Sequence, residues 1–270
     1  MDYTIVTAFY IMKSKFSTDK YKEWLSNFLA LKMNCVFFTD DRTKKWLDTW
    51  INVSNDAKIR FVILEMDKFI TAKYDWSKQL EMDDEKNYHS RELYMIWNEK
   101  INFLKLSSEI NPFQTDWFLW CDAGSLRQKI FIDDDFTKSD VIPDLENDKT
   151  YFFRVPCLYH NNYFLKNLEQ YKCNNTDLRM IQGGFILTNL KSCRWIHQEY
   201  YDLLDRLYEK NLFIGKDQCC YLSLVLQSQY AKVLQITKHK LIHQFSDVWF
   251  FVFPFILGLS NYSQISYFIQ

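Results

Sequence analysis

The stretch Asp116-Trp117-Phe118-Leu119-Trp120-Cys121-Asp122-Ala123-Gly124-Ser125 joins a short apolar run to a carboxylate and a glycine. The apolar residues predict a strand over Trp117–Cys121. In open α/β sheets ligands bind beyond the carboxyl ends of strands, so Asp122 would be well placed to hold a metal ion that bridges phosphates. Gly124 would let the backbone or a ligand approach closely. The structural alternative is that Asp122 caps the next turn and that Gly124 supplies a positive φ.

On both sides of this stretch, short runs of β-branched and aromatic residues alternate with amphipathic stretches. Further strands are predicted at Thr4–Phe9, Cys35–Thr39, Ile59–Leu64, Tyr151–Val155, Phe185–Thr188 and Val233–Ile236. Helical spacing of apolar residues predicts one helix near 21–31, a second from a cap at Ser90 to Ile110, and a third near 192–210. The alternation favours βαβ units, and therefore an α/β fold with a mainly parallel central sheet flanked by helices.

The chain contains no repeat or low-complexity linker, so we expect a single domain over 1–270, with 228–270 as a C-terminal segment folded back over the sheet. The segments 74–86 and 133–148 are polar and acidic without a period, and we predict exposed loops there. The longest apolar run, Val248–Leu259, is shorter than the ~20 residues of a membrane-spanning helix. We interpret it as a core or docking segment, with peripheral membrane contact as the alternative.

The composition narrows the class of protein. The 270 residues include 33 Lys and Arg against 34 Asp and Glu, and 48% are hydrophobic, which is typical of a soluble globular protein. The near-neutral charge excludes nonspecific DNA binding. An aromatic share of 18% suits a pocket that stacks rings or sugars as well as a dense core. Seven cysteines without a Cys-x-x-Cys pair, and no signal-peptide pattern at the N-terminus, favour a reduced, cytoplasmic compartment.

Two further segments carry candidate site residues. In Gln182-Gly183-Gly184-Phe185 two glycines stand directly before a predicted strand, where they would expose backbone N–H groups beside a ligand; a tight turn is the alternative. In Gly215-Lys216-Asp217-Gln218 the aspartate precedes a helical pattern. Asp217 would cap that helix, or it would act with Gln218 on sugar hydroxyls or at a reacting centre.

Taken together, these segments resemble the HtrL/YibB family of bacterial and viral proteins. The matching blocks are Trp97-Asn98-x-Lys100, Asn111-Pro112-Phe113, Phe118-x-Trp120-Cys121-Asp122-Ala123-Gly124-x-x-Arg127, Gln182-Gly183-Gly184-Phe185 and Gly215-Lys216-Asp217-Gln218. The resemblance covers roughly residues 3 to 255. That family is classed with GT-A-fold glycosyltransferases, which implies transfer of a sugar from a nucleotide-sugar donor.

The resemblance also implies a metal ion. In glycosyltransferases of this fold an Asp-x-Asp binds Mn²⁺ or Mg²⁺, but here the matching positions are Asp122-Ala123-Gly124, so the second carboxylate is missing. His243, six residues before Trp249, is similar to a late histidine ligand of glycogenin-type enzymes. The implied metal ligands are therefore Asp122 and His243. A second Asp-x-Asp at 133–135 is interpreted as part of a solvated loop.

The remaining implied roles follow the same family. Asp217 and Gln218 would be catalytic, with retention of anomeric configuration favoured; if the enzyme inverts, Asp217 would be the general base. The nucleotide-sugar would contact Thr7, Ala8, Tyr10, Asp40, Lys100, Asp122, Ala123, Gly124 and Arg127. The sugar or acceptor would contact Gln182, Gly183 and Gly184. His239 is a weaker choice of metal ligand than His243, and His89, His160 and His197 are assigned ordinary core or surface positions.

These observations predict a metal-dependent glycosyltransferase in the cytoplasm of a bacterium or of a virus-infected cell. It would move a sugar from a nucleotide donor, a UDP-sugar in our interpretation, to a glycan or a lipid-linked saccharide. The alternative is a catalytically inactive nucleotide- or sugar-binding protein of the same fold, which the missing second carboxylate favours.

Overall fold

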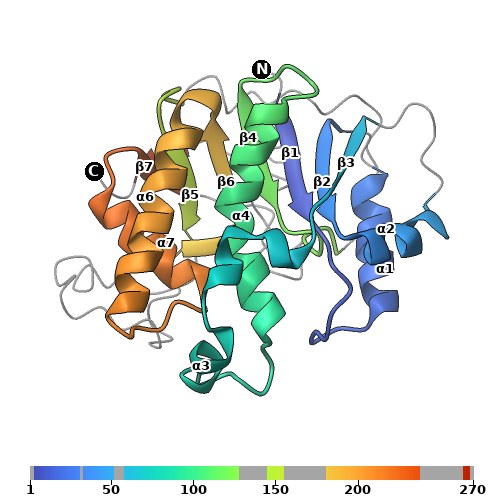
Figure 1. Cartoon of the computed structure of the whole chain (residues 1–270). Coiled ribbons are helices and arrows are strands. Elements are labelled where there is room, and N and C mark those ends of the chain that lie inside the picture. Colours follow the sequence, from blue (N-terminus) through green and yellow to red (C-terminus); the bar gives the residue numbers. More distant parts are fainter. Residues whose placement is uncertain are drawn as a thin grey trace.

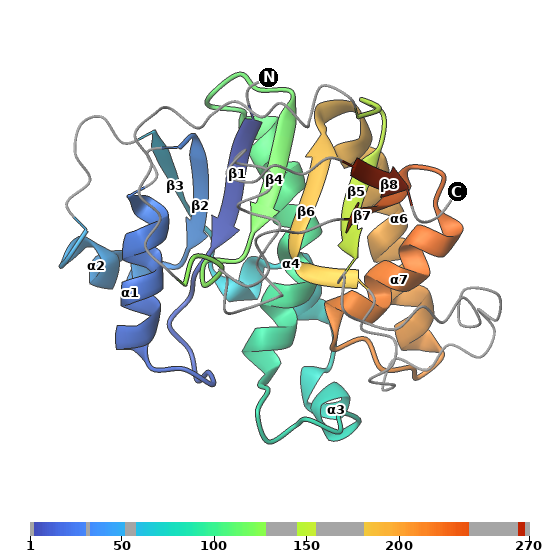
Figure 2. The same cartoon turned by 180° about the vertical axis from the view of Figure 1, so that it is seen from behind.

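The structure, a computed structural model of the chain, describes residues 3–30, 33–51, 58–127, 145–154, 181–237 and 264–267. Within these ranges the strands are β1 (Tyr3–Ala8), β2 (Cys35–Thr39), β3 (Ile59–Ile63), β4 (Trp117–Cys121), β5 (Thr150–Arg154), β6 (Ile181–Asn189), β7 (Ala231–Thr237) and β8 (Gln264–Tyr267). They form one sheet in the order β3-β2-β1-β4-β6-β5-β7-β8 (Figures 1 and 2).

The strands β3, β2, β1 and β4 are parallel to their neighbours, and β6 lies antiparallel between β4 and β5. Strand β7 is parallel to β5, and β8 is antiparallel to β7. All the described strands except β6 and β8 therefore share one direction, which confirms the predicted α/β fold with a mainly parallel sheet. As a consequence, the carboxyl ends of β1 and β4 and the amino end of β6 lie at the same edge.

The described α-helices are α1 (Thr18–Leu29), α2 (Asp41–Asp48), α3 (Trp76–Glu81), α4 (Arg91–Ile110), α6 (Leu190–Glu209) and α7 (Asp217–Gln227), with 3₁₀ turns at Met66–Lys68 and Ile70–Lys73. Helix α4 begins as predicted, because Ser90 Oγ accepts a hydrogen bond from the Leu93 N–H at 3.2 Å. It ends at Asn111, whose φ of 34° is left-handed and stops the helix.

Both faces of the sheet are covered. Neighbouring residues of a strand point to opposite faces, so β4 contributes to two cores. Phe118 and Trp120 pack in the core that includes residues of α4, α6 and α7, whereas Trp117, Leu119 and Cys121 pack in the core that includes residues of α1 and α2. Figure 1 shows α4, α6 and α7 on the near face of the sheet. Burial on both faces explains why β4 is apolar throughout.

The prediction of an exposed loop over 74–86 is wrong in part. Asp75 caps α3 within this segment, and Trp76 is buried, with its Nε1–H donating to Thr71 O at 2.7 Å. Gln79 is buried as well, since its Oε1 accepts from the Ile214 N–H at 2.7 Å. Gln79 therefore binds a distant part of the chain, whereas most of the charged residues of this segment are exposed as predicted.

Two further differences from the prediction concern β6 and the C-terminal segment. Gly183 and Gly184 lie within β6, because β6 extends to Ile181 and pairs with β5 across a register shift at Phe152/Phe153. Within 228–270 the described residues form β7 and β8, which continue the sheet at one edge. Among the described residues, no helix combines the length and the apolar character needed to span a membrane. The apolar run 248–259 lies outside the described residues.

Candidate active site

A cavity of about 180 Å³ opens at the carboxyl edge of β1 and β4. One wall is aromatic and combines Phe9 and Tyr10, which follow β1, with Phe16, which precedes α1, and with Tyr21 and Trp24 of α1. The rings of Phe16 and Trp24 lie edge to face, with centroids 4.9 Å apart. The polar lining residues include Lys100, Asp122 and Arg127. We call this space the aromatic cavity; it combines flat apolar walls with both signs of charge.

Arg127 also belongs to the aromatic wall. Its guanidinium lies 4.6 Å from the ring centroid of Trp24 and 5.3 Å from that of Phe16. Gly124 lets the loop after β4 approach this wall, since a Cβ there would lie 3.2 Å from Trp24 Cε3. This close approach is the role predicted for Gly124.

A second cavity, of about 240 Å³, shares Trp97, Lys100 and Asp122 with the first. We call it the polar cavity. Its other lining residues are Gln182, Gly183 and Gly184 from β6, Lys216, Asp217 and Gln218 at the start of α7, and Glu85 and His89 from the loop before α4. The three predicted segments therefore meet here, because the end of β4, the amino end of β6 and the start of α7 converge at one edge.

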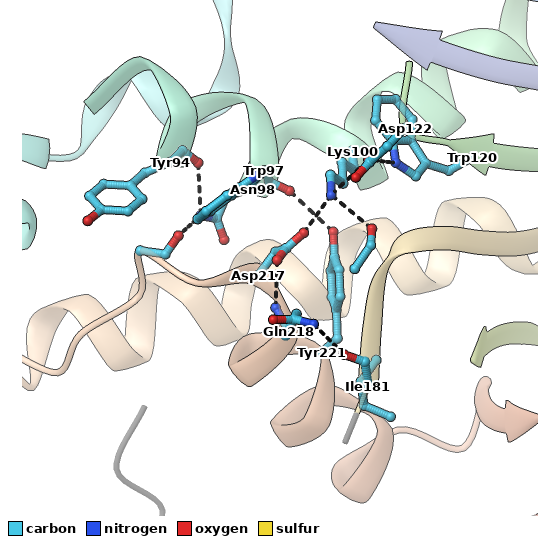
Figure 3. Close-up of polar contacts among 12 residues, drawn as sticks. Tyr94, Trp97, Asn98, Lys100, Trp120, Asp122, Ile181, Asp217, Gln218 and Tyr221 are labelled. Carbon is cyan, nitrogen blue, oxygen red and sulfur yellow. Dashed lines mark hydrogen bonds and ion pairs between the residues drawn. The ribbon is translucent and has the colours of Figure 1, made fainter. Parts of the chain in front are cut away.

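Lys100 stands where the two cavities meet. Its Nζ lies 2.8 Å from Asp217 Oδ2, 2.8 Å from Gly183 O and 3.1 Å from Asp122 Oδ1. Figure 3 shows the side chain between the two carboxylates. Three acceptors match the three N–H donors of an ammonium group, so this buried cation is fully satisfied. Lys100 thereby ties α4 to β6, to the end of β4 and to the start of α7.

The charge state of this group follows from its surroundings. Burial lowers the pKa of Lys100, but the carboxylates of Asp122 and Asp217 outweigh burial and raise it above its ordinary value. Lys100 is therefore an ammonium ion at neutral pH. With two carboxylates around one ammonium, the junction carries one surplus negative charge.

The Asp217 carboxylate fills space that only a glycine leaves open. A Cβ on Gly183 would lie 2.7 Å from Asp217 Oδ2 and 2.9 Å from Oδ1. Asp217 is the first residue of α7, with Lys216 in the cap position, and its Oδ1 accepts from the Gln218 N–H at 2.8 Å. Gln218 Nε2 donates to Ile181 O at 2.9 Å, so the amide binds the amino end of β6.

Asn98 holds the segment before α7 in place. Its Nδ2 donates to Tyr94 O at 2.9 Å (Figure 3) and to Ile214 O at 3.1 Å. Its Oδ1 accepts from Tyr200 OH at 2.7 Å. The buried amide thus joins α4, α6 and the chain entering α7. This explains why Asn98 belongs to the same sequence block as Lys100.

The predicted site residues fall into three groups. The aromatic cavity is lined by Ala8, Tyr10, Lys100, Asp122, Ala123, Gly124 and Arg127, and the polar cavity by Lys100, Asp122, Gln182, Gly183, Gly184, Asp217 and Gln218. Thr7 and Asp40 line neither. Thr7 is buried within β1, and Asp40 caps α2 by accepting from the Thr43 N–H at 2.6 Å. His243 and the segment 133–135 lie outside the described residues.

The structure also brings together residues that the sequence did not group. Asp83 Oδ2 lies 2.6 Å from His89 Nδ1 and accepts from Tyr94 OH at 2.5 Å. Lys216 Nζ lies 3.1 Å from Asp83 Oδ1 and 2.6 Å from Glu85 Oε2. Burial raises the pKa of the Asp83 carboxyl, but the hydrogen bonds from His89, Tyr94 and Lys216 hold it well below its ordinary range. Asp83 is therefore a buried carboxylate.

Two places were tested for a metal ion. Asp83, Glu85 and His89 each place a possible ligand atom within 4.8 Å of the others, close enough for one ion. Lys216 already pairs with both of those carboxylates, however, so this group is an ion-pair cluster. Asp122 suits a metal better: its side chain is 33% exposed, its Oδ1 accepts from Trp120 Nε1 at 2.8 Å, and among the described residues its Oδ2 has no partner.

Comparisons with known proteins were made against this geometry. No curated protein matches the chain. Among solved structures, the galactosyltransferase LgtC in complex with donor and acceptor sugar analogues is similar, with 14% sequence identity and a TM-score of 0.44 over 82% of this chain and 70% of that chain. Residues 1–250 match the family described as "Bacterial protein of unknown function (HtrL_YibB)". Since this match spans more than half of the 270 residues, the chain belongs to the HtrL_YibB family.

Proposed function

We propose that the protein is a glycosyltransferase that moves a sugar from a nucleotide-sugar, a UDP-sugar in the first instance, to a saccharide acceptor. The observation that carries the proposal is the meeting of the two cavities at Lys100, Asp122 and Asp217. A nucleotide-sugar has a flat base at one end, a diphosphate in the middle and a polyhydroxyl ring at the other. The aromatic cavity, the charged group and the polar cavity follow one another in the same order: the first suits the base, the second the diphosphate and the third the sugar.

The aromatic cavity is the proposed site of the nucleotide. Phe16, Tyr21 and Trp24 offer ring faces and edges for a base, and Arg127 adds positive charge on the same wall. Ala8, Tyr10, Ala123 and Gly124 line the rest of the path from β1 to β4. Thr7 and Asp40 belong to the proposal only through neighbouring residues, since neither lines the cavity.

The polar cavity is the proposed site of sugar transfer. Asp217 and Gln218 offer a carboxylate and an amide, which are the groups that bind sugar hydroxyls. Gln182 adds a buried amide whose Nε2 and Oε1 have no hydrogen-bond partner among the residues that the structure describes. Because an unpaired buried amide costs about 1–3 kcal/mol, a ligand hydroxyl that pairs with Gln182 would regain this free energy.

The proposal includes Mn²⁺ or Mg²⁺, with Asp122 and His243 as its ligands. The exposed oxygen of Asp122 and the surplus negative charge beside Lys100 support a cation here. Such an ion would neutralise charge on the departing diphosphate. The chain's own residues would hold donor and acceptor in orientation, which is the other main source of rate.

We place this reaction in the cytoplasm. The described cysteines, namely Cys35, Cys121, Cys193, Cys219 and Cys220, are buried thiols, which suits a reduced compartment. The saccharide acceptor, whether free or lipid-linked, would be reached from that side. A peripheral membrane contact through 248–259 stays a prediction.

The second candidate is a nucleotide- or sugar-binding protein without catalytic activity. It is favoured by one observation: the position two residues after Asp122 is Gly124, so the loop after β4 brings one carboxylate where Asp-x-Asp enzymes bring two. Both candidates predict nucleotide binding. They differ in whether the bond between sugar and diphosphate is broken.

Turnover therefore tests the proposal. Purified protein would be incubated with UDP-glucose, UDP-galactose and UDP-N-acetylglucosamine, each with Mn²⁺, and release of UDP would be followed with water or an array of saccharides as acceptor. We expect release with at least one donor, and its loss in Asp217→Asn. UDP binding without release from any donor would support the inactive binding protein, and the absence of both would contradict both candidates.

A further inference from the structure

We propose that His89 is the general base of this reaction: its Nε2 receives the proton of the acceptor hydroxyl in the polar cavity, with Asp83 as the residue that positions the ring. The inference rests on the proposed function and adds a residue to it. It also predicts inversion at the anomeric carbon, whereas the resemblance to glycogenin-type enzymes favours retention.

The ring of His89 is oriented by a buried carboxylate. Its Nδ1 lies 2.6 Å from Asp83 Oδ2, and the Asp83 side chain is fully buried while that of His89 is 16% exposed. A carboxylate at Nδ1 favours the tautomer with the proton on Nδ1, which leaves a lone pair on Nε2. In the part of the chain that the structure describes, Nε2 has no hydrogen-bond partner. Since His89 lines the polar cavity, Nε2 is the ring nitrogen available to a ligand there.

Asp83 is itself held in place from several elements. Tyr94 OH from α4 donates to its Oδ2 at 2.5 Å, the Glu85 N–H donates to its Oδ1 at 2.9 Å, and Lys216 Nζ lies 3.1 Å from Oδ1. The ring of His89 also meets Trp97 edge to face, with centroids 5.0 Å apart. A ring fixed on two sides is what a base needs to point at one substrate atom.

The rival base on the same cavity is Asp217, whose pKa is raised by burial but whose two oxygens already have partners. Asp217 Oδ1 accepts from the Gln218 N–H, and Oδ2 pairs with Lys100, so both oxygens are already engaged. Protonating this carboxylate would leave Lys100 with one anionic partner fewer. Asp217 is better suited to hold donor hydroxyls and to fix Lys100 at the junction.

The proposed step balances as follows. The acceptor oxygen forms a bond to the anomeric carbon of the donor sugar while His89 Nε2 takes the acceptor proton. The bond between the anomeric carbon and the diphosphate oxygen breaks, and its electron pair leaves with the nucleoside diphosphate. The imidazolium, stabilised by the Asp83 carboxylate, then returns its proton to solvent.

Among the described residues, two groups of charged side chains surround His89. Asp83, Glu85 and Lys216 form the cluster around it, and Lys100, Asp122 and Asp217 line the same cavity. Each of these two groups has two carboxylates and one ammonium, so each has one carboxylate more than it has cations. An imidazolium formed during the step would therefore lie in a favourable field.

The test uses the full chain, with Mn²⁺, the UDP-sugar that the wild type cleaves, and water or an active saccharide as acceptor. His89→Gln is expected to lower kcat about 100-fold or more, the usual size of general-base catalysis, while the Kd for UDP changes less than about two-fold. In His89→Ala, added imidazole is expected to restore part of the lost rate. Proton NMR of the product is expected to show the inverted anomer.

His197→Gln is the matched control. That histidine lies on α6, pairs with Asn102 at 3.1 Å and lines neither cavity, so its replacement is expected to leave turnover unchanged. Full turnover by His89→Gln, a retained anomer, or loss of UDP binding in place of turnover would each overturn the role of His89. None of these results affects the proposed function, which fails only if the wild type itself cleaves no donor.

Discussion

Gly183 and Asp217 are packed so closely that a methyl group on the glycine would come within 2.7 Å of the carboxylate. The two residues are far apart in the sequence, one in β6 and the other at the start of α7. The absence of a side chain at 183 therefore sets the position of a carboxylate that also binds Lys100. Glycine is needed here for close packing between two elements.

Gly183→Ala is the corresponding test. The new methyl group must push Asp217 away from Lys100, so we expect the free energy of unfolding to fall by about 1–3 kcal/mol and sugar transfer to be strongly reduced. Gly124→Ala is a matched comparison, because its Cβ would meet the rings of Trp24, at 3.2 Å, and Tyr21, at 3.4 Å, and no charged group. Urea unfolding of both variants should show the smaller loss for Gly124→Ala; equal losses would contradict the packing explanation.

Lys100→Met tests the charged junction. Removing the ammonium leaves Asp217 buried without its partner, and breaking a buried pair typically costs about 3–5 kcal/mol. Adding Asp217→Asn removes the unpaired charge, so the double variant should be more stable than Lys100→Met alone. A double-mutant cycle from urea unfolding measures this coupling. Additive effects of the two substitutions would show that the pair contributes no coupling energy.

Much of the fold could be predicted because its signals are local. The bounds of β2 and β4 are confirmed at Cys35–Thr39 and Trp117–Cys121, since each is a continuous apolar run. The cap at Ser90 was predictable for the same reason. The site was partly predictable, because residues that follow parallel strands must gather at one edge of the sheet, as Asp122 and the residues after β1 do.

The remainder depends on contacts that no local pattern contains. Lys216 is 131 residues from Glu85, so its ion pairs with Glu85 and Asp83 could not be predicted from spacing. His89 was assigned an ordinary position because its sequence neighbours show no recognisable spacing of partner residues. Lys100 was expected to contact the nucleotide-sugar, and its burial between two carboxylates could not be predicted from its position in the sequence.

Phe16→Ala tests the aromatic cavity as the proposed site of the nucleotide's base. Phe16 lines the aromatic cavity, is half-buried and contacts Trp24 and Arg127, so its loss removes a ring face from the wall. Stacking of one base on one aromatic side chain is worth about 1–3 kcal/mol, which corresponds to a rise of about 5-fold to 150-fold in the Kd for UDP. Tyr88→Ala is the control, since Tyr88 is 68% exposed and lines neither cavity. If calorimetry gives both variants the same Kd for UDP, the nucleotide's base binds elsewhere.

His197 gives the protein a pH-dependent stability. Burial, with a contribution from Lys105, lowers the pKa of His197 to about 4, against 6.5 for a free histidine. The unfolded chain therefore binds a proton between these values that the folded chain does not, and stability falls as the pH drops from 6.5 to about 4. Allowing for solvent screening, we expect a loss of about 1–2 kcal/mol. Urea unfolding at pH 7 and at pH 4.5 gives the free energy of unfolding at each pH. Between these values it should fall less in His197→Gln than in the wild type. An equal fall in both proteins would exclude His197 as the cause.

The nucleotide-sugar site at Asp122 is tested most directly by calorimetric titration of UDP-glucose with Mn²⁺ into the wild type and into Asp122→Asn. We expect one binding site per chain in the wild type, and a binding constant at least 10-fold weaker in the variant, while thermal unfolding shows that the variant is folded. Equal affinities, or no heat of binding from UDP-glucose and from the other UDP-sugars in the wild type, would contradict the proposed role of Asp122.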